Sequence, residues 1–163
     1  MFARPFIDSL DFALMGKTMH GEIPVRELVR LHDVLADTEG AVRYVLRGFQ
    51  DKQGEAHLEL SLEGDCNLRC QRCLSGLGYS IRQTSRLRLS QDPDWEASPL
   101  EEEEEDSIPA DKHMDVLALV EDEILLALPF APKHEEGSCR MASEHLVQPD
   151  ANPFAVLAGL KKN

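Results

Sequence analysis

The stretch CNLRCQRC, residues 66–73, places three cysteines at the spacing C-x3-C-x2-C. Radical S-adenosylmethionine enzymes use this spacing to hold three irons of a four-iron cluster through cysteine thiolates. The shorter C-x2-C of Cys70 and Cys73 is also half of many zinc sites, because two thiolates on a tight turn can reach one tetrahedral ion. The stretch therefore indicates three alternatives: an iron–sulfur enzyme, a zinc site, or three thiols beside a turn.

The iron–sulfur alternative requires more chain than is present. A radical enzyme needs a partial barrel of alternating strands and helices, roughly 200 residues when scaled from full barrels of about 250. Only 90 residues follow Cys73, and the pattern contains no repeated strand–helix–strand unit. A small thiol- or iron–sulfur-dependent enzyme that uses Cys66, Cys70 and Cys73 therefore stays only as the alternative function.

A zinc site needs two further ligands, and the chain offers them far from the first pair. His134 and Cys139 are spaced H-x4-C beside a glycine. We therefore predict Cys70, Cys73, His134 and Cys139 as the metal ligands, with Cys66 as another candidate and zinc as the cofactor. Two other interpretations stay open. The cysteines could be buried or unreactive thiols, or a redox-sensing thiol whose pKa nearby arginines lower.

Arginines cluster between Cys66 and Ser90, where the chain has no acidic residue. Three of them alternate along one expected strand and two lie beside the cysteines, which predicts a phosphate-contacting surface for RNA made of Arg69, Arg72, Arg82, Arg86 and Arg88. The surface lacks interleaved aromatic rings, since Tyr79 is expected on the opposite side. The alternative is structural: Glu59 and Glu63 on the neighbouring strand could pair with these arginines.

The charge distribution limits the classes of partner. The chain has 163 residues and a net charge of −13, and residues 91–163 carry all of it, with 18 acids against 5 bases. An acidic chain is a poor general binder of nucleic acid. The run EEEEED, residues 101–106, is a solvated segment or a phosphate mimic toward a basic partner such as a ribosomal protein.

Several functional classes are not indicated. No apolar run reaches the length of a membrane span, and the first residues lack a secretory signal, so we expect a cytoplasmic protein without membrane contact. Cysteines in that compartment are more often thiols or metal ligands than disulfides. The chain has no nucleophile elbow, P-loop, HExxH or dinucleotide glycine motif, and no small-molecule substrate is evident.

The elements that must position the cysteines follow from periodicity. Alternation of period two predicts three antiparallel strands, over residues 41–49, 57–63 and 79–89, with the cysteines at the second connection. Helical spacing predicts a helix over residues 24–37, a second over 114–128 that stops at Pro129, and a short third over 152–160. Residues 5–23 are expected to be extended and broken near Gly16, and residues 91–110 to form a disordered acidic loop.

These elements predict a single α+β domain over residues 1–163. We expect a small antiparallel sheet of about three to five strands, packed with two or three helices and interrupted by the acidic loop.

Three segments resemble one known family. CQRCL (70–74), VEDEILLALPFAPKH (120–134) followed by Cys139, and NPFAVLAGLKKN (152–163) together closely resemble the bacterial YceD family. Its members are called large ribosomal RNA subunit accumulation proteins, with plastid relatives in plants. The order and spacing of the segments match as well, and the resemblance covers most of the chain from about residue 41 onward.

The resemblance implies a non-enzymatic factor linked to the synthesis, processing or stability of 23S ribosomal RNA. Its partners would be ribosomal RNA or proteins of the assembling large subunit. By the same resemblance, Cys70, Cys73, His134 and Cys139 match the family motifs and Cys66 lies outside them.

Overall fold

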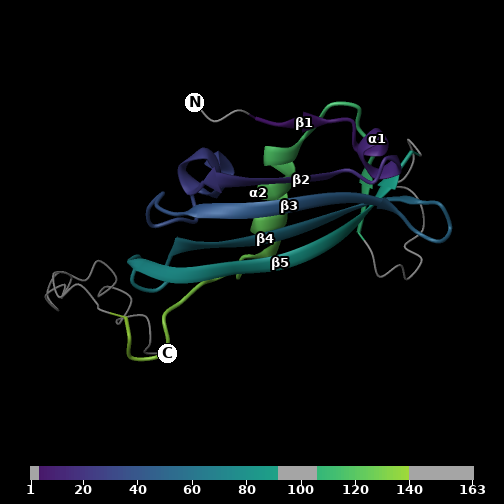
Figure 1. The fold of residues 1–163 in the computed structure, drawn as a ribbon. Coiled ribbons are helices and arrows are strands. Elements are labelled where there is room, and N and C mark those ends of the chain that lie inside the picture. Colours follow the sequence, from purple (N-terminus) through teal and green to yellow (C-terminus); the bar gives the residue numbers. More distant parts are fainter. Residues whose placement is uncertain (1–3, 92–105, 140–163) are drawn as a thin grey trace, which may run out of the picture.

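The computed structural model describes residues 4–91 and 106–139 of the chain. A five-stranded sheet in the order β2-β3-β4-β5-β6 dominates the fold (Figure 1). Its strands are β2 (Thr18–Pro24), β3 (Ala41–Gln50), β4 (Ala56–Arg69), β5 (Gly76–Ser90) and β6 (Asp106–Pro109). Two helices, α1 (Ser9–Leu14) and α2 (Val116–Ala127), complete a mixed α+β fold.

The three antiparallel strands expected from the alternating pattern are confirmed as β3, β4 and β5. Their registers pair Leu46 with Leu60 and Glu59 with Arg86, so the apolar and the charged positions fall on opposite faces. Two further strands enlarge the sheet. β2 is antiparallel to β3, whereas β6 is parallel to β5.

The boundaries of the expected acidic loop were wrong at one end. Residues 106–109 form β6, with Ile108 paired to Leu89 of β5. The rest of the expected loop, residues 92–105, lies outside the described residues, as does the helix expected over residues 152–160. A strand of four residues in parallel pairing has no alternating sequence pattern from which it could be predicted.

The helix expected over residues 24–37 was wrong. This segment instead forms two short 3-10 turns, at Val25–Glu27 and Val29–Leu31. The apolar side chains still point into the core, since Val25, Leu28 and Leu31 are at most 1% exposed. Beyond them the chain pairs with the end of β4, where Arg69 donates its N–H to Val34 O over 2.9 Å. Apolar residues every three or four positions fit consecutive 3-10 turns as well as a helix.

The prediction of an extended segment over residues 5–23 did not include helix α1, which lies within it. Asp8 caps it by accepting the N–H of Asp11. The helix packs its buried residues Phe12 and Ala13 against β3 at Gly48, where a Cβ atom would lie 2.5 Å from Phe12 O. Gly48, close to the end of β3, is therefore the residue that lets α1 approach the sheet.

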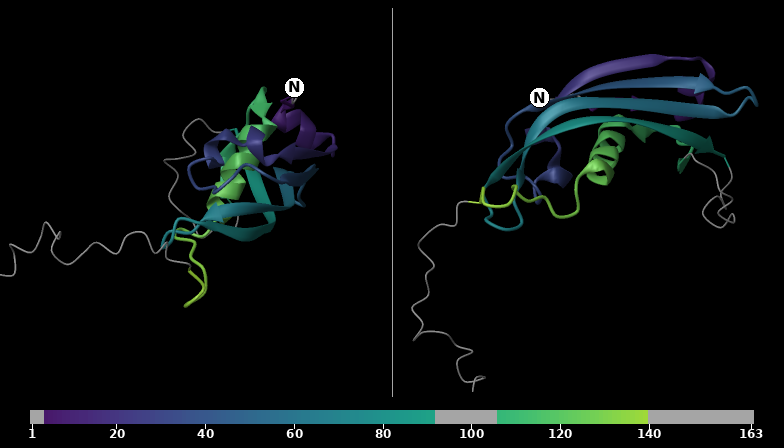
Figure 2. Two further views of the ribbon diagram at one scale, coloured as in Figure 1. Left: turned by 90° about the vertical axis from the view of Figure 1, so that its left-hand side faces the viewer. Right: turned by 90° about the horizontal axis from the view of Figure 1, so that it is seen from below.

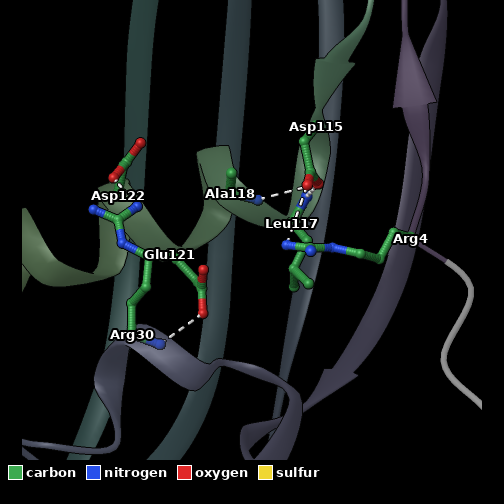
Figure 3. Close-up of polar contacts among 7 residues, drawn as sticks. All are labelled: Arg4, Arg30, Asp115, Leu117, Ala118, Glu121 and Asp122. Atoms are coloured by element: carbon green, nitrogen blue, oxygen red, sulfur yellow. Dashed lines mark hydrogen bonds and ion pairs between the residues drawn. The ribbon is translucent and has the colours of Figure 1, made fainter.

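The helix predicted over residues 114–128 is confirmed as α2, which spans Val116–Ala127. Asp115 caps its first turn by accepting the N–H groups of Leu117 and Ala118 (Figure 3). Just before it, β7 (Met114–Asp115) pairs with β1 (Phe6–Ile7). In its middle, the buried Glu121 accepts the N–H of Arg30, whose guanidinium pairs with Asp122. These contacts tie α2 to the 3-10 segment.

The sheet has two unlike faces. Figure 2 shows it curving around α2, and the side chains on this inner face form one core with the helices. Leu58 and Leu60 of β4 and Ile124 of α2 are fully buried there. Among the described residues, the outer face carries no helix (Figure 2). Most of its exposed side chains are charged or polar, with Val45 as an apolar exception. The described part of the chain contains no helix long and apolar enough to cross a membrane.

Candidate functional site

The connection between β4 and β5 positions the first two cysteines. Cys70 donates its N–H to Ser75 O and its carbonyl accepts the N–H of Leu74, both over 2.9 Å, which closes a tight turn around Cys73. Leu74 adopts a left-handed backbone with φ of 61°, and it is the only non-glycine residue of the described chain to do so. The turn folds the Cys70 and Cys73 sulfurs toward one point, with Cys70 fully buried.

The segment after α2 brings the other two ligands. Pro132 O accepts the N–H of Gln71 over 2.8 Å, so residues 128–139, here called the strap, run back to the cysteine turn. His134 then places Nε2 3.0 Å from Gly76 O, at the first residue of β5. Donation from Nε2 to this carbonyl leaves Nδ1 free to bind a metal, the usual arrangement for a ligating histidine.

The four side chains converge as a metal site requires. The sulfurs of Cys70, Cys73 and Cys139 and Nδ1 of His134 all lie within 4.8 Å of one another. Cys70 Sγ is 3.8 Å from Cys139 Sγ, while His134 Nδ1 is 3.4 Å from Cys73 Sγ and 3.8 Å from Cys139 Sγ. A tetrahedral zinc ion bound by thiolates and imidazole has S···S edges of about 3.8 Å and S···N edges of about 3.5 Å. We call this group the Cys3His cluster.

The four groups of the Cys3His cluster differ in the direction in which their surroundings shift the pKa. Burial alone raises the pKa of the Cys70 thiol, but backbone N–H groups of Cys73, His134 and Arg72 outweigh it and hold this pKa at about 5. Hydrogen bonds from Ser75 lower the pKa of Cys73, and the hydrogen bond to Cys70 raises the pKa of His134. Burial raises the pKa of Cys139. The lowered pKa values of Cys70 and Cys73 favour thiolates, whose charge a cation would neutralise, whereas the raised pKa values of Cys139 and His134 oppose the proton loss that metal binding requires.

Cys66 takes no part in this cluster. It lies within β4, opposite Tyr79, and its side chain is 4% exposed in the apolar core. Burial, with Asp65 and Asp37 adding to it, raises the pKa of Cys66 to about 11, so it remains a thiol. The structure therefore separates Cys66 from Cys70 and Cys73, and the C-x3-C-x2-C stretch does not converge on one cluster.

A second group of potential ligand atoms has an ordinary explanation. Asp51, Glu55 and His57 lie within 4.8 Å of one another at the β3–β4 turn. The Asp51 carboxylate accepts the N–H groups of Gln53 and Glu55 there, as a turn-forming aspartate does. We assign no site to these residues.

The arginines of β5 lie on the outer face, paired with glutamates. Register places Arg86 opposite Glu59 and Arg82 opposite Glu63, and the closest N···O distances are 3.1 and 3.6 Å. Arg88 lies 3.7 Å from the Glu55 carboxylate. Tyr79, on the inner side, donates its hydroxyl to Ala127 O. The expected faces are thus observed, together with the cross-strand pairing that was the structural alternative.

Arg69 and Arg72 differ from the β5 arginines. Arg69 donates from its guanidinium to Leu35 O over 3.1 Å, and Arg72 is exposed on the cysteine turn. Neither pairs with a carboxylate among the ion pairs of the described residues. These two therefore carry the positive charge that is least neutralised within the predicted arginine surface.

Comparison with known proteins places this geometry in context. A family model described as "Large ribosomal RNA subunit accumulation protein YceD" matches residues 58–161, which include all four residues of the Cys3His cluster. A protein of Haemophilus influenzae with the same description is 27% identical over 154 aligned residues, covering 87% of this chain and 86% of the relative. No solved structure matches the chain.

Proposed function

Because this chain belongs to the YceD family of large ribosomal RNA subunit accumulation proteins, we propose that it supports the accumulation of 23S ribosomal RNA by binding rather than by catalysis. The family match over more than half of the chain is the observation that carries this proposal. The binding partner would be ribosomal RNA or a protein of the assembling large subunit. Either would be met in the cytoplasm, where we expect the protein to act.

The proposal predicts a selective change in ribosomal RNA. Cells that lack the gene should contain less large-subunit relative to small-subunit ribosomal RNA, and a plasmid copy should restore the ratio. The measurement is the ratio of the two RNA species in total RNA from matched cultures. An unchanged ratio in a verified deletion strain would contradict the proposed function.

Charge favours a protein as the direct partner. The net charge of −13 repels phosphate over the range of a Debye length, about 8 Å at physiological salt. On the outer face, the β5 arginines already face glutamates, so few unneutralised cations remain for a nucleic acid. We therefore propose contact with a protein of the assembling subunit as the main mode of action.

Direct contact with RNA is the second candidate, and Arg69 and Arg72 are the observation that favours it. If RNA binds the arginine surface, the Arg69→Ala, Arg72→Ala double variant should lower the slope of log affinity against log salt by roughly 1.4 to 1.8. Fluorescence anisotropy with a large-subunit RNA fragment at several salt concentrations measures this slope. The double variant Arg86→Ala, Arg88→Ala is the comparison, because these arginines are paired with glutamates. If neither double variant changed the slope, RNA binding by the arginine surface would be excluded.

We propose that the Cys3His cluster binds one Zn²⁺. Three sulfurs and one imidazole nitrogen are a donor set that zinc prefers, and the distances between them suit its tetrahedral geometry. With four protein ligands, no position is left for water or substrate, which is the property of a structural rather than a catalytic zinc. The ion would supply a cross-link between the cysteine turn and the strap.

A further inference from the structure

Two sulfurs of the Cys3His cluster lie close enough to be brought into a bond with one another. Cys70 Sγ is 3.8 Å from Cys139 Sγ, and both residues are free cysteines in this structure. A disulfide bond is about 2.0 Å long, so its formation requires the two atoms to approach by roughly 1.8 Å. The cluster therefore holds the two partners of a disulfide bond as well as the ligands of a metal ion.

Of these two sulfurs, that of Cys70 is fixed and that of Cys139 is able to move. The buried Cys70 sulfur accepts the N–H of Arg72 over 3.5 Å. Cys139 follows Gly137, which has φ of 82° and no neighbour within 4 Å of its Cβ position. Within the described chain, the backbone hydrogen bonds of residues 135–139 stay inside that segment. We therefore expect Cys139 to close the gap.

The third cysteine of the cluster is engaged elsewhere. Cys73 Sγ lies 2.9 Å from Ser75 Oγ and 3.4 Å from Nδ1 of His134. A bond from Cys73 to Cys70 would have to rearrange the hydrogen-bonded turn that carries both, whereas a bond from Cys139 moves only the end of the strap. The geometry therefore favours the pairing of Cys70 with Cys139.

We propose that hydrogen peroxide converts the Cys3His cluster into a Cys70–Cys139 disulfide and thereby releases its zinc. This inference rests on the zinc site proposed above and adds to it the regulation of that site. Peroxide reaches Cys139 before Cys70, because Cys139 is partly exposed whereas Cys70 is fully buried.

The reaction has two steps. The Cys139 thiolate attacks one oxygen of the peroxide, which breaks the O–O bond and gives a sulfenic acid and a hydroxide ion. The Cys70 thiolate then attacks the Cys139 sulfur, forms the S–S bond and expels a second hydroxide ion. Two electrons pass from the two thiolates to the peroxide. Zinc keeps its oxidation state and dissociates because two of its four ligands are lost.

The disulfide would replace the cross-link that zinc makes. Both join the cysteine turn to the strap, but the disulfide does so without a metal, between residues 69 positions apart. A cross-link over a long loop stabilises a protein mainly by restricting its unfolded chain. The oxidised protein should therefore keep the strap in place after zinc leaves. A dithiol reductant should restore the thiols that bind zinc.

The test treats the full-length, zinc-loaded protein with hydrogen peroxide and maps its disulfides. Trypsin, which cuts after lysine and arginine, separates the four cysteines into the peptides 53–69, 70–72, 73–82 and 134–140. After alkylation of the remaining thiols, mass spectrometry of the unreduced digest should find peptide 70–72 joined to peptide 134–140. A colorimetric chelator should find one zinc released for each disulfide formed.

Cys66→Ala is the matched control for this map. Cys66 lies in the core within β4 and takes no part in the cluster. The variant should release the same amount of zinc and form the same cross-link as the wild type.

Two ligand variants test the stabilising effect without depending on zinc. Cys73→Ser and Cys139→Ser each lose one ligand, but only Cys73→Ser retains both cysteines of the disulfide. Peroxide should raise the thermal midpoint of zinc-free Cys73→Ser by several degrees, and should leave that of zinc-free Cys139→Ser unchanged.

Three results would overturn the inference. They are a digest in which Cys70 is joined to Cys73 instead, a wild-type protein that keeps its zinc and forms no disulfide, and equal midpoints of oxidised and reduced Cys73→Ser. Zinc is measured before peroxide is added, so a chain without zinc would contradict the zinc site alone, while the peptide map still decides the disulfide. The ribosomal RNA ratio of the deletion strain tests the cellular function separately.

Discussion

Cys70→Ser should abolish zinc binding and cause the largest loss of stability of any ligand substitution. Cys70 is fully buried and its sulfur lies 3.8 Å from that of Cys139, so its replacement by serine leaves three strong ligands and puts a hydroxyl in place of the buried thiolate. When free zinc exceeds the dissociation constant about a thousandfold, its binding contributes roughly 4 kcal/mol to the free energy of unfolding. The variant should lose about that amount in urea denaturation followed by circular dichroism.

The control for this prediction is the neighbouring cysteine that the cluster excludes. Cys66→Ala should keep one zinc per chain, because Cys66 faces the core from within β4. A chelator should lower the stability of the wild type and of Cys66→Ala alike, and should leave Cys70→Ser unchanged. If Cys66→Ala lost the metal, or if the metal were an iron–sulfur cluster with broad visible absorption, the assignment of the four ligands would be wrong.

Gly48→Ala should destabilise the protein through a clash that no side chain can relieve. A Cβ atom there would lie 2.5 Å from Phe12 O and 2.6 Å from the Cα atom of Ala13, both of which are backbone atoms of α1. Either the helix must move or the strand must bend, and overpacking of this kind costs about 1 to 3 kcal/mol. The urea midpoint should fall without a change in the slope of the transition.

Gly76→Ala is the matched substitution at the start of β5. The nearest atom to its Cβ would be that of Ala36 at 3.6 Å, an ordinary contact, so we expect a change within about 0.5 kcal/mol. Equal stability of the Gly48 and Gly76 variants would mean that α1 does not pack on β3 as described.

The sheet could be predicted from the sequence because its signal is local. Leu58, Leu60 and Leu62 alternate with polar residues, and the alternation alone assigns each residue to a face. The 3-10 turns could not be predicted in the same way. Val25, Leu28 and Leu31 are buried as a helix would bury them, so burial spacing does not distinguish the two structures. The approach of α1 to Gly48 depends on a contact between distant parts of the chain.

The composition of the Cys3His cluster was predicted, whereas its surroundings were not. The H-x4-C spacing named His134 and Cys139 as the other two ligands, at least 61 residues further along the chain than Cys73, and the family resemblance pointed to the same positions. The exposure of Phe130 was not predictable, because an apolar residue beside a helix is normally assigned to the core. Its exposure follows from the route of the strap, which only the fold determines.

The sequence separation within the Cys3His cluster has a consequence for synthesis. His134 follows Cys73 by 61 residues in the chain. At synthesis rates of about 5 to 20 residues per second, His134 is therefore made roughly 3 to 12 seconds after Cys73. The β2–β5 meander can form during that interval, since its strands are consecutive in the chain. A zinc ion bound as proposed could be fully coordinated only after α2 and the strap have been made. Coordination of zinc would therefore be among the last steps of co-translational folding, and a chain truncated before residue 134 would leave the ribosome with Cys70 and Cys73 incompletely ligated.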